Sequence, residues 1–145
     1  MPTSPLPTLP ASRATRIMHL ALVVGVILAA AVLVYRSGTA GPPVVVSPLI
    51  GYITAAFGFV NLLVASAFLL PRIPRRSAAD APDDFWSRTE IRTAAIIVWA
   101  LIEGSSLIAL VGYFLTGGVA PAIVAGLGIV VLVFASPARI EGDGA

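Results

Sequence analysis

A single carboxylate, Glu103, lies in the middle of the apolar run from Ile91 to Leu115. An α-helix needs roughly 20 such residues to cross a bilayer, and this run is long enough. A charged side chain at the centre of a spanning helix costs about 2.5–3.5 kcal/mol on insertion scales, so it normally faces a partner or a cavity. Glu103 is therefore the first candidate for chemistry, either as a group that carries a proton or cation or as a polar contact between helices.

A second polar side chain, Asn61, lies at a matching depth in another apolar run. Glu103 lies about 16 Å of helix beyond Arg92, at 1.5 Å per residue. Asn61 lies about 14 Å before Leu70 on the same scale. Because an amide–carboxyl bond between helices in lipid contributes about 0.6–2 kcal/mol, we predict a buried contact between Glu103 and Asn61. Two further side chains share the helix face of Glu103, namely Trp99 and Ser106.

The residue types that most catalytic sites need are missing from this sequence. It contains no cysteine and one histidine, which excludes thiol nucleophiles, disulfides and sites built on two histidines. A hydrolase would need a nucleophile beside a base, and His19 and Ser106 lie at different depths. The one adjacent acidic pair, Asp83-Asp84, lies in a proline-bounded loop. We therefore expect no catalytic residue, no metal site and no cofactor.

The composition places these residues in a membrane protein. Apolar residues make up 58% of the chain and charged residues 11%, against roughly 45–50% and 25% in ordinary globular proteins. The nine basic residues are all arginines, and they flank apolar runs without forming a basic patch interleaved with aromatics. We therefore expect a lipid bilayer as partner and no nucleic acid.

Four apolar runs predict an all-α bundle of four transmembrane helices, arranged as two antiparallel hairpins in one membrane domain, 16–136. We expect a disordered, proline-rich tail over 1–15, a loop over 71–87 and a second tail over 137–145. The first run could also be read as a cleaved signal peptide, but it exceeds the roughly 7–15 residues of a signal h-region, so we favour a retained helix. The expected helices are 17–35, 48–70, 88–115 and 119–135.

Small residues recur along two of these helices and predict the faces that pack. Small faces let helix backbones approach closely in lipid, where dispersion drives association. The row in the second helix comprises Gly51, Ala55, Gly58, Asn61 and Ala65, and the row in the fourth comprises Gly118, Ala122 and Gly126.

The distribution of arginines predicts the orientation of the bundle. Eight arginines lie in the two tails and the middle loop or directly beside them, and one, Arg36, lies in the first connection. Because cytosolic segments carry the excess of basic residues, we expect both termini in the cytosol of a multi-pass protein of the cell (inner) membrane. The loop arginines either act as topology determinants alone or also contact anionic lipid headgroups. They are Arg72, Arg75, Arg76, Arg88 and Arg92.

The run Ala100-Leu101-Ile102-Glu103-Gly104, with Tyr113 farther along, resembles the carboxylate-bearing outer helix of the rotary ATP synthase proteolipid subunit (subunit c). The resemblance covers residues 99–115. In that family a mid-membrane carboxylate carries a proton or a sodium ion, and the resemblance implies this role for Glu103 alone. The chain as a whole resembles small uncharacterised four-helix bacterial membrane proteins, which implies no activity.

Three functions follow from the sequence. The first is a structural or accessory membrane protein without catalytic activity, in which Glu103 contacts another helix. The second is a proton- or cation-handling subunit, although no second membrane carboxylate completes a relay within one copy. The third is a lipid- or quinone-binding membrane protein. Other membrane subunits, or further copies of the chain, are the expected protein partners.

Overall fold

The computed structural model of the chain describes residues 9–41 and 46–142, and all regular structure within them is helical. Two long helices come first, and the second, α2, continues through a π-helical segment, Val64–Leu69, into a 3-10 turn, Leu70–Arg72. A long helix α4 and a shorter α5 follow, each next to a short helix at one end of the bundle. The helices are α1 (Ala11–Ala40), α2 (Pro48–Leu63), α3 (Pro82–Ser87), α4 (Thr89–Thr116), α5 (Val119–Phe134) and α6 (Pro137–Glu141).

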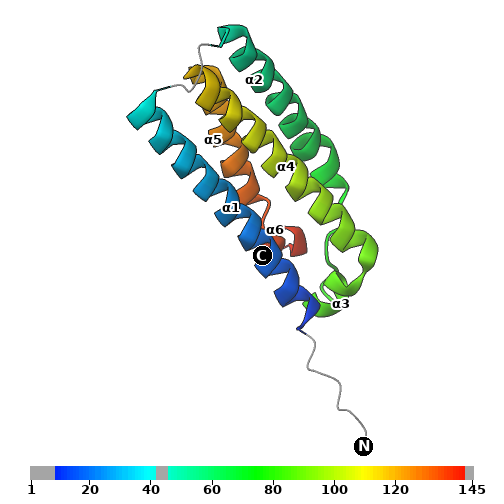
Figure 1. The fold of residues 1–145 in the computed structure, drawn as a ribbon. Coiled ribbons are helices and arrows are strands. Elements are labelled where there is room, and N and C mark those ends of the chain that lie inside the picture. Colours follow the sequence, from blue (N-terminus) through cyan, green and yellow to red (C-terminus); the bar gives the residue numbers. More distant parts are fainter. Residues whose placement is uncertain (1–8, 42–45, 143–145) are drawn as a thin grey trace, which may run out of the picture.

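Helix α4 occupies the centre of the bundle. It packs against α1, α2 and α5, whereas α1 and α2 lie on opposite sides of it (Figure 1). The predicted hairpin of the third and fourth helices is present, because Gly117 takes a left-handed conformation with φ 65° and turns the chain into α5. The first two helices run antiparallel, but with α4 between them they do not pack as a hairpin.

Three helices are long and apolar enough to cross a membrane. They are α1, the extended α2 from Pro48 to Arg72, and α4. Helix α5 is apolar throughout but has 16 residues, or about 24 Å of helix. Its outer side chains, like those of α1 and α2, include many exposed large hydrophobics. These features are consistent with a helical bundle embedded in a membrane.

The small residues of α2 allow it to approach α4 closely. A Cβ atom placed on Gly58 would lie 2.9 Å from the backbone oxygen of Ser105, and one on Gly51 would lie 2.7 Å from Oγ1 of Thr116. The buried face of the extended α2 comprises Gly51, Ala55, Gly58, Leu62 and Ala65. Four of the five residues of the predicted row lie on it, and Leu62 takes the place expected for Asn61.

The small row predicted on α5 is not its packed face. Gly126 has no neighbour near the position of a Cβ atom, whereas a Cβ on Gly128 would collide with Oγ of Ser106 on α4. The buried residues of α5 are Pro121, Val124, Ala125, Gly128 and Leu132. The predicted face and the observed face of α5 both contain small residues, but the side of α5 that packs against its neighbours is not the predicted side.

Three segments expected to lack helix contain some. Helix α1 begins at Ala11, inside the predicted tail, of which residues 1–8 lie outside the described part of the chain. Helix α3 lies in the predicted loop and α6 in the predicted C-terminal tail, and each begins with proline. Proline suits the first helical position because its missing N–H would have no partner there.

The close approach of α2 to α4 predicts unequal effects for two identical substitutions. Gly58→Ala should destabilise the protein by about 1–3 kcal/mol, because the added methyl group meets backbone that cannot move without shifting a helix. Gly104→Ala is the matched control, since nothing lies near its Cβ position, and it should be neutral or stabilising by up to about 1 kcal/mol. Thermal unfolding in detergent, followed by circular dichroism, measures both. Equal effects would show that the α2–α4 interface is not close-packed at Gly58.

Candidate functional site

Glu103 lies at mid-length of α4, on the side that faces α1. Its Oε1 atom is 3.8 Å from the position that a Cβ atom would occupy on Gly25. The carboxyl group of Glu103 therefore lies against α1 at Gly25, at ordinary van der Waals distance from where a Cβ atom would be. Glu103 is half-buried, and among the described residues no hydrogen bond to its carboxyl group is present.

Asn61 does not meet Glu103. Its Nδ2 donates to the backbone oxygen of Phe57, 2.9 Å away and one turn earlier in the same helix. Asn61 lies one residue before the packed position Leu62, so its side chain is half-buried at the edge of the α2–α4 interface. Glu103 points toward α1, on a different side of α4. The structure therefore does not bring the predicted pair together.

The other two predicted site residues serve helix packing. Ser106 faces α5 at Gly128, and its hydroxyl donates to the backbone oxygen of Ile102 at 3.0 Å. Trp99 is fully buried, and its Nε1 donates to the backbone oxygen of Ala135 at 2.7 Å. Both side chains thus connect α4 to α5 instead of serving the carboxyl group of Glu103.

The end of α5 receives polar contacts from two other helices. The last carbonyls of any helix have no partner within that helix. Here Trp99 of α4 donates to Ala135, and Nε2 of His19 on α1 lies 3.0 Å from the backbone oxygen of Leu132, which requires the proton on Nε2. The His19 and Trp99 rings meet edge to face with centroids 4.8 Å apart. Side chains from two helices therefore close the end of a third.

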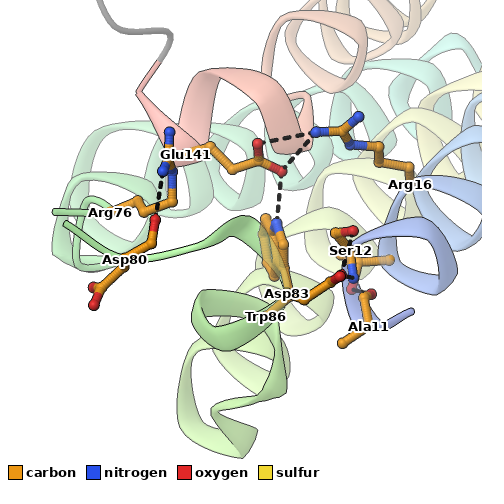
Figure 2. Close-up of polar contacts among 9 residues, drawn as sticks. Ala11, Ser12, Arg16, Arg76, Asp80, Asp83, Trp86 and Glu141 are labelled. Atoms are coloured by element: carbon orange, nitrogen blue, oxygen red, sulfur yellow. Dashed lines mark hydrogen bonds and ion pairs between the residues drawn. The ribbon is translucent and has the colours of Figure 1, made fainter. Parts of the chain in front are cut away.

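A second layer of contacts lies beside this one, at the end of the bundle formed by the start of α1, by α3 and by α6, here called the α6 end. The carboxylate of Glu141 accepts from Nε1 of Trp86 at 2.7 Å and from Nη2 of Arg16 at 3.0 Å (Figure 2). Glu141 is 6% exposed and Trp86 is fully buried, so the bond from the indole has little competition from water. The short helix α6 is thereby fastened to α1 and α3.

The same end carries a cap for the first helix. Oδ1 of Asp83 accepts from the backbone N–H of Ser12 at 3.1 Å and from its hydroxyl at 2.6 Å (Figure 2). The first N–H groups of a helix lack intrahelical acceptors, and a carboxylate there also faces the positive end of the helix dipole. The two bonds from Ser12, the hydroxyl first, hold the pKa of Asp83 below its usual value of 3.8.

Few features of the sequence indicate these contacts. Glu141 and Arg16 are 125 positions apart, and we expected Glu141 in the C-terminal tail and Arg16 at the edge of the membrane domain. One local pattern indicated the short helix: Ser136-Pro137 is a typical helix start, and α6 begins there, where we expected a tail. The partners of Glu141 could not be read from that pattern.

The five loop arginines have different environments. Nη1 of Arg76 donates to the backbone oxygen of Asp80 at 2.6 Å, and Arg88 forms an ion pair of 3.1 Å with the carboxylate of the same residue. Arg92 is half-buried at the start of α4. The remaining two, Arg72 and Arg75, are exposed, and each lines a hollow at the α6 end.

The described residues contain no cluster of three or more histidine, aspartate or glutamate side chains that could hold a metal ion. Comparisons of the sequence with family models and of the chain with curated proteins and solved structures returned no match. The site is therefore interpreted from its own geometry.

The contacts of Glu141 predict that removal of its carboxylate lowers the stability of the fold. Glu141→Ala should destabilise the protein by about 1–3 kcal/mol, because it leaves the buried indole N–H of Trp86 without an acceptor. Arg16→Gln keeps the Trp86 bond and removes an ion pair whose arginine is 56% exposed, so it should cost at most about 1 kcal/mol. Thermal unfolding in detergent, followed by tryptophan fluorescence, compares them. A larger effect of Arg16→Gln would assign the stabilisation to the ion pair instead of the indole bond.

The cap on α1 predicts a pH dependence. A pKa that is lower in the folded state than in the unfolded state stabilises the fold above the unfolded value, and this contribution is lost as the pH falls through the folded value. The first turn of α1 should therefore stay protected above about pH 4 and loosen at lower pH. Titration of the Asp83 carboxyl carbon by NMR should give a pKa below 3.8, and Ser12→Ala should raise it. An unchanged titration in the Ser12→Ala variant would show that the Ser12 hydroxyl does not lower the pKa of Asp83.

Proposed function

We propose that this chain is an integral membrane protein without catalytic activity that crosses the bilayer four times and acts as a structural or accessory component of a membrane assembly. The observation that carries the proposal is the position of Glu103, a half-buried carboxyl group at mid-helix on the outer part of the α1–α4 contact. A polar group at this depth needs a partner, and a helix of another chain can supply one.

The four-span arrangement is supported by the surface of the bundle. Large exposed apolar side chains cover α1, α2 and α5, including Leu28, Phe57 and Ile123. Monomeric soluble proteins rarely expose contiguous apolar surfaces of this extent. Helix α5 is short for a span, but it runs alongside α4 (Figure 1), and it too exposes large apolar side chains.

The orientation with both termini in the cytosol is supported by the position of the arginines. The described arginines other than Arg36 belong to segments at the α6 end, and Arg36 lies near the opposite end of α1 (Figure 1). Such an asymmetry favours the cytosolic side for the arginine-rich end. Retention of α1 in the mature protein is supported by its contacts with Glu141, Asp83 and Leu132, which a cleaved signal peptide would not need.

A proton- or cation-handling role is the second candidate, and the same carboxyl group favours it. No hydrogen-bond donor among the described residues binds the carboxyl group of Glu103, so no bond within the bundle has to break when it gains or loses a proton. The two functions differ in what the carboxyl group does: in the accessory role it stays neutral and bonds to a partner helix, and in the second it titrates during turnover.

Infrared difference spectroscopy on the purified protein, compared with Glu103→Gln, separates these functions. For the accessory role we expect the neutral carboxyl band to persist between about pH 6 and 9, because hydrocarbon disfavours the charged form. On native gels of solubilised membranes, Glu103→Gln should preserve the size of the assembly and Glu103→Leu should reduce it, because only glutamine keeps a hydrogen-bonding group. Glu90→Gln, an exposed substitution at the start of α4, is the matched control.

Two outcomes would contradict the accessory role. One is reversible titration of Glu103 coupled to proton flux in liposomes, which would support the second function. The other is an assembly of unchanged size in Glu103→Leu.

A further inference from the structure

A hollow of about 380 Å³ opens at the α6 end of the bundle, between the end of α2 and the junction of α5 with α6. Its volume falls within the range of roughly 300–1,000 Å³ typical of small-molecule sites. Its lining is mainly apolar and contains two guanidinium groups. The residues that matter for the argument are Leu70, Val131, Phe134 and Ile140, with Arg75 and Arg139.

The lining of the hollow changes from apolar to positively charged along the direction of the helices. Leu70 and Val131 belong to the apolar parts of α2 and α5, and Ile140 is buried in α6. Arg75 and Arg139 lie beyond the ends of the two apolar helices and are exposed. In a bilayer this order places the apolar part of the lining at the depth of the acyl chains and the two arginines at the level of the headgroups. An occupant that matches it has an apolar portion joined to an anionic head.

The electrostatics of the hollow favour an anion. Among the described residues, its charged lining side chains are both arginines, and none of those lining residues is acidic. The nearest acid along the chain, Glu141, is occupied by Trp86 and Arg16. The guanidinium carbon of Arg139 lies 4.6 Å from the centroid of the Phe134 ring, so a cation–π contact holds this charge at the edge of the hollow. Guanidinium groups match the geometry of phosphate oxygens and bind them through paired hydrogen bonds.

We propose that this hollow binds an anionic glycerophospholipid, with the phosphate between Arg75 and Arg139 and the upper acyl chain against Leu70 and Val131. The proposal rests on the membrane-spanning arrangement proposed above, but not on any role of Glu103. It selects two arginines from the nine in the sequence, one of them in the C-terminal segment. Basic pockets between helices at the cytosolic membrane surface are a recurrent way of binding such headgroups.

Native mass spectrometry of the full chain, released from detergent that contains equal amounts of phosphatidylglycerol and phosphatidylcholine, tests the proposal. The unchanged protein should retain phosphatidylglycerol preferentially. The double variant Arg75→Gln/Arg139→Gln should reduce this preference about tenfold or more, because two charge-assisted contacts are lost. The control Arg13→Gln/Arg72→Gln removes the same charge at the same end, and Arg72 lines a separate, smaller hollow, so the control should keep the preference.

A second variant tests the space inside the hollow separately from the charge at its edge. Val131→Trp fills the hollow and keeps both arginines, so it should also reduce retention of phosphatidylglycerol, with circular dichroism to verify that the helices are intact. Three results would overturn the proposal: equal loss in the control variant, full retention in Val131→Trp, or displacement of the lipid by millimolar inorganic phosphate, which would identify a phosphate site without a lipid. Failure of lipid selectivity in a protein that still inserts into membranes would overturn the lipid site and leave the four-span arrangement standing.

Discussion

The end of the short helix α5 imposes the strongest constraint on this structure. In the four-span arrangement proposed above, α5 would be about 24 Å long in a bilayer core about 30 Å thick, where a backbone carbonyl without a donor costs several kcal/mol. Its terminal carbonyls at Leu132 and Ala135 therefore need donors from elsewhere in the bundle. His19 and Trp99 supply them, and in doing so they fix α1 and α4 against the end of α5.

The rest of the α6 end follows from this arrangement. The Trp86 ring lies 6.2 Å from that of Trp99, so α3 packs beside the closed end of α5. The indole N–H of Trp86 is then buried and needs an acceptor, which α6 provides through Glu141. The region is a chain of satisfied donors and acceptors that fastens α1, α3, α4, α5 and α6 together. The opposite end of the bundle is joined by a glycine turn between α4 and α5.

The two sites that we propose for partners differ in chemistry and in depth. Glu103 offers one polar group at mid-bundle, where a neighbouring helix is the natural partner. The hollow at the α6 end offers two guanidinium groups above an apolar floor, where an amphiphile fits better than a helix. A role as an accessory membrane component is compatible with both, because such a protein must contact other subunits and lipid.

The sequence by itself determined the helical character of the chain, three of the four segments predicted to be long and apolar enough to span, and the tight turn between α4 and α5, because these depend on run length and on local backbone preferences. Tertiary structure decided which face of each helix is buried. Asn61 and Leu62 are adjacent, and the interface selects Leu62, which turns Asn61 away from α4. It also joined Arg16 to Glu141 across 125 positions. Residue spacing fixes angles within one helix, but the rotation of helices about each other is set by packing among all of them.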